Sequence, residues 1–141
     1  MAYSTQEGVE LYFGASNVAK WADLDNEGDA DVIAARVAAA IDSADTRIDD
    51  ELRGGPYTVP FEDEVPAIIT DLSRKLAGID LYGARGSIEI DEATGERINR
   101  YGALERACQR LLSRLHSGSL RLSLAQSSEV PEQVSDDEDT E

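Results

Sequence analysis

The fold is decided most clearly by residues 98–122, INRYGALERACQRLLSRLHSGSLRL. Apolar side chains recur there at steps of three and four residues, which is the spacing of one buried face of an amphipathic helix. Gly118 is suited to end that helix, because glycine readily adopts the left-handed conformation that often follows the last turn. Leucines at 120, 122 and 124 then alternate with other residues, as in an extended segment. This end of the chain is therefore suited to assembly rather than to catalysis.

Two earlier stretches carry the same helical periodicity. The first ends at Gly54 and Gly55, and the second starts with Pro66, which the first turn of a helix tolerates. We therefore expect an all-α protein, a small bundle of four or five helices with an inserted hairpin or loop and an extended C-terminal segment. The long helices are predicted at about 30–53, 65–84 and 98–116, the short ones at 5–13 and 17–22, and the hairpin or loop at 87–97.

The length of 141 residues suits one domain. We expect a helical domain at residues 1–118, an extended docking segment at 119–126 and an acidic, disordered tail at 127–141. The tail contains mainly Ser, Glu, Asp, Gln and Pro, with only two valines, so it cannot bury enough apolar surface to fold alone.

The charge is distributed unevenly along the chain. The net charge is −16, with 13 basic and 29 acidic residues. Residues 1–63 have a net charge of −10, residues 64–125 of +1 and residues 126–141 of −7. This asymmetry permits head-to-tail contact between the acidic part of one copy and the basic part of another. The overall sign argues against a general nucleic-acid-binding surface.

A basic stripe in the last helix is the main candidate interface. Arg106, Arg110 and Arg114 are spaced four residues apart, away from the apolar face. We expect them to meet acids of a neighbouring subunit, with the cluster Asp49, Asp50 and Glu51 as the candidate acceptor. Pairing with Glu105 in the same helix could instead account for part of the stripe, and the acidic cluster could simply be solvated.

The leucines after Gly118 form the second candidate interface. Leu120, Leu122 and Leu124 have no partner strand nearby in the sequence, and an unpaired edge invites a strand from another chain. We expect this segment, with the tail behind it, to order only on a partner protein or on a neighbouring subunit. Alternatively, the leucines fold back on their own helices.

The sequence contains no pattern that predicts catalysis or a cofactor. Asp23, Asp25, Glu27 and Gly28 begin like a calcium-binding EF-hand loop, but Ala34 occupies the position where a bidentate Glu should close the shell. His116 and Cys108 are the only histidine and cysteine, so no His/Cys metal site is supported. We expect no enzyme activity, no cofactor and no metal. A polar capping loop is favoured over weak calcium binding at residues 23–31.

No targeting or membrane segment is evident. Residues 1–14 carry two acids and lack a long apolar run, and no stretch approaches the roughly 20 apolar residues that span a bilayer. We therefore expect a soluble protein made in a cytoplasm.

Read as a whole, residues 3–122 resemble a phage family, the Mu-like head–tail connector (neck, or head-completion) proteins. The match depends on the order and spacing of short motifs rather than on one of them. Residues 87–97 are longer than the link expected for the family, and the acidic tail appears particular to this chain. The motifs are Tyr3-Ser4-Thr5 with Phe13-Gly14, Trp21 to Asp25, Asp42 to Leu52, Tyr57, Val65-Pro66, Asp80 to Gly83, Arg100-Tyr101, Ser117-Gly118 and Leu120.

The resemblance implies a mainly helical subunit that forms a ring, commonly a dodecamer, beneath the portal of a tailed phage. The ring would extend the DNA channel, let genomic DNA pass without sequence-specific binding, and join the capsid to another neck, tail-terminator or tail protein. It implies a virion protein of the neck, made in the host cytoplasm, with residues 1–118 as the connector domain and the portal as the partner on which the docking segment orders. The alternative is an acidic binding module, such as a DNA mimic that inhibits a nucleic-acid-binding protein, although the near-neutral second half counts against it.

Overall fold

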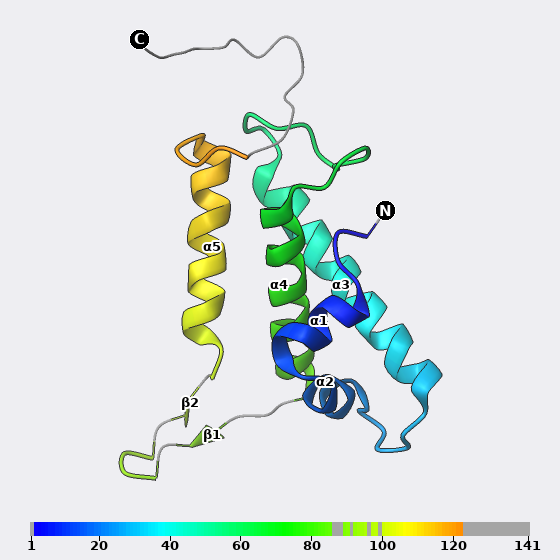
Figure 1. Cartoon of the computed structure of the whole chain (residues 1–141). Coiled ribbons are helices and arrows are strands. Elements are labelled where there is room, and N and C mark those ends of the chain that lie inside the picture. The colour runs from blue at the N-terminus through cyan, green and yellow to red at the C-terminus, as the bar shows by residue number, and fades with distance from the viewer. Residues whose placement is uncertain (1, 86–88, 91, 96, 99, 123–141) are drawn as a thin grey trace, which may run out of the picture.

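The protein is an all-α bundle, as the sequence predicts. The computed structural model describes residues 2–85, 89–90, 92–95, 97–98 and 100–122. Figure 1 shows the long helix α4 between the long helices α3 and α5, with the short helices α1 and α2 packed across them near one end. Within the described residues the elements are α1 (Gln6–Phe13), α2 (Ala15–Ala22), α3 (Ala30–Leu52), α4 (Ala67–Arg85), β1 (Glu89–Ile90), β2 (Arg97–Ile98) and α5 (Gly102–Ser117).

The predicted boundaries hold for α3 and α4 but not for the start of α5. That helix begins at Gly102 rather than at residue 98, because Ile98 belongs to β2 and pairs with Glu89 in an antiparallel hairpin. Of the two alternatives predicted between α4 and α5, a hairpin or a loop, the structure forms the hairpin. The turn between its strands includes Gly95 with a φ of +74°, a conformation that glycine adopts at little cost.

Polar side chains fix where two of the helices begin. Thr5 Oγ1 accepts a hydrogen bond from the Gly8 amide at 3.1 Å, which caps α1. Asp29 Oδ1 accepts from the Asp31 amide at 3.0 Å and thereby caps α3. Such a cap contributes about 1 kcal/mol to helix stability. The predicted capping role of the acidic loop before α3 is therefore confirmed for Asp29.

An aromatic cluster joins α1, α2 and α4 to the start of α5. The rings of Phe13, Trp21, Tyr82 and Tyr101 meet edge to face, with centroid separations of 4.9–5.8 Å. This geometry is the favoured one for aromatic pairs. Gly78 lies directly beneath Phe13, and a Cβ atom at that position would overlap the phenyl ring. The close approach of α1 to α4 therefore depends on a glycine.

The segment after α5 packs on the protein's own core. Leu122 is only 4 % exposed, Leu120 is partly buried, and the Leu122 amide donates to Tyr57 Oη at 2.7 Å. The prediction that this segment orders only on assembly is therefore wrong for Leu120 and Leu122, because both side chains pack against the core and Tyr57, in the loop before α4, accepts the hydrogen bond of the Leu122 amide. Leu120 and Leu122 thus belong to the helical domain, whereas Ser119 and Arg121 are exposed. Leu124 lies outside the described residues.

No helix in the described part of the chain is long and apolar enough to cross a membrane.

Candidate functional site

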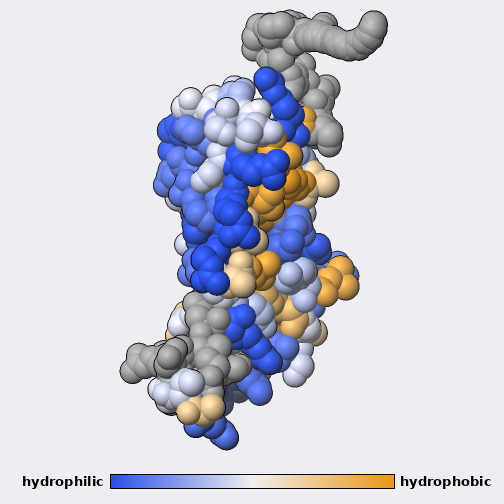
Figure 2. Space-filling view, turned by 90° about the vertical axis from the view of Figure 1, so that its left-hand side faces the viewer, coloured by the Kyte–Doolittle hydropathy of each residue, from blue (hydrophilic) through white to orange (hydrophobic). Residues whose placement is uncertain are grey.

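The arginine stripe, defined as Arg106, Arg110 and Arg114, lies on the outer side of α5. All three residues are exposed, whereas Cys108, Leu112 and Leu115 of the same helix are buried. At about 100° per residue, the stripe lies nearly opposite that buried face. None of the three makes an ion pair with another described residue. Figure 2 looks at the molecule from the side of α5 and shows strongly hydrophilic residues along it.

Glu105 does not neutralise the stripe. Its Oε2 atom lies 3.2 Å from Arg47 Nη1 of α3, and Arg47 also donates to Gln109 Oε1 at 2.8 Å. Because Glu105 is the only acid of α5, the helix has no other carboxylate for its own arginines. Ion pairs within α5 therefore do not neutralise the arginine stripe.

Several other cations are held by acids of the same chain. Arg74 and Lys75 share Asp71, at 2.7 and 2.6 Å, and both lie over the Tyr12 ring. Burial alone would raise the pKa of Asp71, but the hydrogen bonds and charges of Lys75 and Arg74 outweigh it and lower that pKa. Arg36 and Arg53 pair with Asp25 and Asp50 at 3.1 and 2.6 Å. The stripe therefore differs from these other cations, because no acid among the described residues neutralises it.

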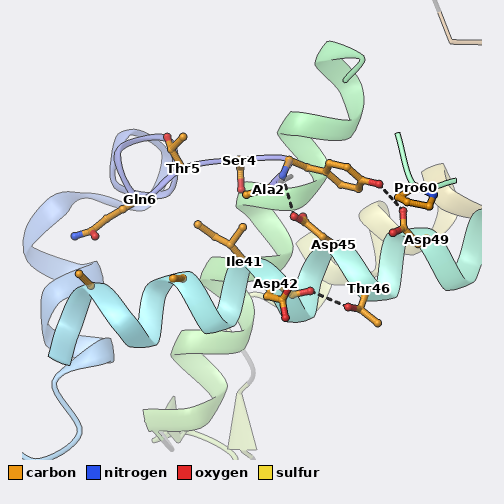
Figure 3. Close-up of a pocket in the computed structure, with 13 residues that line it drawn as sticks. Ala2, Ser4, Thr5, Gln6, Ile41, Asp42, Asp45, Thr46, Asp49 and Pro60 are labelled. Atoms are coloured by element: carbon orange, nitrogen blue, oxygen red, sulfur yellow. Dashed lines mark hydrogen bonds between the residues drawn. The ribbon is translucent and has the colours of Figure 1, made fainter. Parts of the chain in front are cut away.

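A groove runs between the N-terminal segment (residues 2–6) and α3 (Figure 3). It has a volume of about 510 Å³, and its α3 side carries three carboxylates, Asp42, Asp45 and Asp49, beside Ala34 and Ala38. Asp42 is exposed and Asp49 half-buried. The groove is therefore acidic on the side that α3 forms.

Buried hydrogen bonds hold the N-terminal segment against this groove. Asp45 is 8 % exposed and accepts from the Tyr3 amide at 2.8 Å and from Ser73 Oγ at 2.6 Å. Burial raises the pKa of Asp45 although both hydrogen bonds oppose the shift. Tyr3 Oη donates to Asp49 at 2.7 Å and accepts from the Phe61 amide at 2.9 Å. Burial and the hydrogen bond to Asp49 raise the pKa of Tyr3.

The acids predicted to form one cluster do not share one face. Asp49 lies at the groove beside Tyr3. Asp50, which pairs with Arg53, and Glu51 instead line a second depression with Ser113 and His116 near the end of α5. Successive helical residues point about 100° apart, so three consecutive acids cannot form one patch. The predicted cluster is thus divided, with Asp49 at the groove and Asp50 and Glu51 together at the end of the bundle near α5.

The arginine stripe and the acidic groove lie on opposite sides of the bundle. In Figure 1, α5 and α3 form the left and right edges, with α4 between them. Arg47, which reaches α5, is roughly 140–160° around the α3 axis from the three groove carboxylates. One subunit thus presents positive charge at one edge and negative charge at the other.

The comparisons with known proteins place this chain in a phage family. Residues 3–138 match the family model described as Bacteriophage Mu, Gp36. The chain belongs to the bacteriophage Mu Gp36 family. No curated protein and no solved structure matches it.

Membership in the Gp36 family makes the chain a phage structural or morphogenesis protein. The match extends past residue 122, where the resemblance seen in the sequence ends, and covers most of the acidic tail.

The sequence of this Gp36-family chain did not by itself point to Asp45 and Ser73. Asp45 follows Ala44 inside the apolar stripe of α3, four residues after Ile41 and three before Ile48. A polar residue at a core position of a helix was the available signal, because such a residue must find hydrogen-bond partners when it is buried. Its partners, Ser73 and the Tyr3 amide, lie too far away in the sequence for a local pattern to identify them.

In this Gp36-family chain, hydrogen bonds to backbone amides stabilise the acidic loop before α3. Asp23 accepts hydrogen bonds from the amides of Glu27 and Gly28 at 3.0 and 2.9 Å. Among the residues that the structure describes, no group of three or more His, Cys, Asp or Glu side chains could hold a metal ion. Burial raises the pKa of the Cys108 thiol, which disfavours the reactive thiolate.

Proposed function

We propose that this protein is the subunit of a head–tail connector ring, a dodecamer beneath the portal of its phage. The ring extends the DNA channel and joins the capsid to the next neck, tail-terminator or tail protein. The observation that carries the proposal is the placement of opposite charges at opposite edges of one subunit, within a family of phage structural or morphogenesis proteins. The role is structural and requires no cofactor.

Opposite-sign edges favour a head-to-tail contact between copies. Such a heterologous contact closes into a ring when the rotation between neighbours permits it. In the proposed ring, the arginine stripe of one subunit faces acids on α3 of the next, with Asp42 and Asp49 as the most accessible groove carboxylates. Asp50 and Glu51 remain candidate acceptors, although Asp50 must first leave Arg53.

The charges would set the register of this contact and would not supply most of its affinity. An exposed ion pair contributes only about 0.2–1 kcal/mol, whereas complementary charge selects orientation and partner. The net charge of −16 also suits a channel wall, because like charge keeps DNA from binding as it passes.

The contact can be tested with a charge-reversal triple variant, Arg106→Glu, Arg110→Glu and Arg114→Glu. A matched control reverses three other exposed cations, Lys20→Glu, Arg53→Glu and Arg121→Glu, and so has the same net charge. Negative-stain images and mass measurement with the portal protein present would report ring formation. We expect rings from wild type and control but not from the stripe variant.

The two possible failures have different meanings. Normal rings from the stripe variant at moderate salt would reject the arginine contact while leaving the connector role intact. No ring or portal complex from the wild-type protein would reject the connector role itself.

A further inference from the structure

The arginine stripe offers an ordered, uncompensated site for an acidic ligand. Its three guanidinium groups lie on consecutive turns of a single helix face, about 6 Å apart along the axis. They are exposed, and no acid of the described chain pairs with them. Other basic side chains, such as Arg36, Arg53 and Lys75, already contact acids. An acidic segment that approaches this net-negative protein would therefore meet its most favourable surface at the stripe.

The chain itself carries a complementary segment. Residues 126–141 include seven acids and no base, and no other stretch of this length is so acidic without a base. This tail begins a few residues after Leu122, whose amide is fixed to Tyr57 beside the end of α5. The tail therefore leaves the folded domain near the same end of α5 as Arg114.

The tail is long enough to reach the whole stripe. From Arg114 back to Arg106 the helix rises about 12 Å, at 1.5 Å per residue. An extended chain spans about 3.3 Å per residue, so four residues cover that distance and the others can form the turn from Leu122. Because the tail is tethered, its local concentration at the stripe is about millimolar, far above that of a free acidic peptide.

We propose that the acidic tail, residues 126–141, docks on the arginine stripe of its own chain in the free subunit. In the assembling ring, the acids of a neighbouring subunit displace it. The tail thereby keeps free subunits from pairing prematurely and is released where the neighbour is held in place. The displacement step rests on the proposed connector role, whereas docking in the free subunit does not.

Carbodiimide cross-linking of the full-length free subunit tests the docking directly. The substitution Arg110→Lys keeps the charge of the stripe and introduces an amine that can be joined to a neighbouring carboxylate. Mass spectrometry then identifies which carboxylates are joined. We expect several-fold more linkage to tail acids, Glu129 to Glu141, than from the native Lys20 on α2, which is also exposed.

A second variant controls for closeness to the start of the tail. Arg53→Lys places an exposed amine next to Gly54, which faces His116 at the end of α5, but outside the stripe. We expect this amine to join Asp50 rather than the tail. Raising the salt to 1 M should remove the tail linkage of the Arg110→Lys variant, because the screening length falls from about 10 Å at 0.1 M to about 3 Å.

Mixing isotopically light and heavy chains separates docking within a chain from docking between chains. Tail linkage within single chains, above both controls, supports the inference. Linkage at the level of the controls overturns it, and so does linkage found only between light and heavy chains.

The regulatory step has its own readout in full-length protein. Replacing the seven tail acids by their amides should allow rings to form on the portal at a lower subunit concentration than wild type requires. An unchanged concentration dependence would overturn the displacement step. Failure of even wild type to form rings would instead reject the connector role and leave the cross-linking result standing.

Discussion

Arg47 of α3 reaches across to Glu105 of α5, with 3.2 Å between Nη1 and Oε2, and so engages the only acid on α5. One ion pair thereby has two effects. It ties two long helices together, and it leaves the arginine stripe without a carboxylate of its own helix. The positive edge of the subunit thus follows in part from how the bundle is packed.

The Arg47–Glu105 pair should contribute modestly to stability. Both side chains are more than one third exposed, so loss of the pair in Arg47→Met is expected to lower the free energy of unfolding by about 0.2–1 kcal/mol. Urea denaturation measures the change. Arg53→Met is the control, because it removes a more exposed pair and should have less effect. Equal losses in the two variants would contradict a role for Arg47 in joining the helices.

The sequence predicts the long helices well because their signals are local. The apolar stripe of α3 and the stop at Gly54 and Gly55 lie within one stretch of chain, and both appear in the structure. The start of α5 could not be placed as well, because Ile98 fits both the helical stripe and the strand that pairs with Glu89. Strand pairing across the hairpin decides that Ile98 belongs to a strand and not to the helix. The periodicity of apolar residues along the chain does not reveal this pairing.

The candidate surfaces were predictable only in part. The arginine spacing is a local pattern, and α5 does expose all three side chains. The position of Leu122 depends on its hydrogen bond to Tyr57, which is 65 residues earlier in the chain. The groove depends on Tyr3, Asp45 and Ser73, brought together from three separate segments. Contacts of this kind come from tertiary packing, which the alternation or spacing of nearby residues does not encode.

Two glycines of α4 should respond oppositely to the same substitution. In Gly78→Ala the new methyl group overlaps the Phe13 ring, and overpacking of a core costs about 1–3 kcal/mol. In Gly83→Ala nothing lies within 4 Å, so the better helix propensity of alanine should stabilise the protein by about 0.5–1 kcal/mol. Thermal melting of both variants checks this. No loss of stability in Gly78→Ala would contradict the packing described for Phe13, and a loss in Gly83→Ala would contradict the open space at that position.

Asp45 should make the stability of the fold depend on pH. Burial raises its pKa in the folded protein, so the folded state binds a proton more readily than the unfolded chain does. Its contribution to stability is therefore greatest below the ordinary pKa of Asp and is lost as the pH rises through the raised value.

The variant Asp45→Asn isolates this contribution, because other titrating groups cancel in the comparison. The free energy of unfolding of wild type minus that of Asp45→Asn should fall as the pH is raised from below 4 towards neutrality. Denaturation curves recorded at several pH values measure it. A difference that grows with pH would show that the hydrogen bonds from Ser73 and Tyr3 outweigh burial and hold the carboxylate ionised.

The C-terminal leucine and its hydrogen bond should matter to the isolated subunit. Leu122→Ala removes a side chain that is only 4 % exposed, and truncation of a buried leucine costs about 2–5 kcal/mol. Tyr57→Phe removes the acceptor of the Leu122 amide and should cost about 1 kcal/mol. Leu11→Ala is the matched control, because Leu11 is 78 % exposed and its loss should change stability little. Urea denaturation of the free protein is the measurement. If Leu122→Ala unfolds at the same urea concentration as wild type but fails to join the portal, the leucine acts in docking and not in the core.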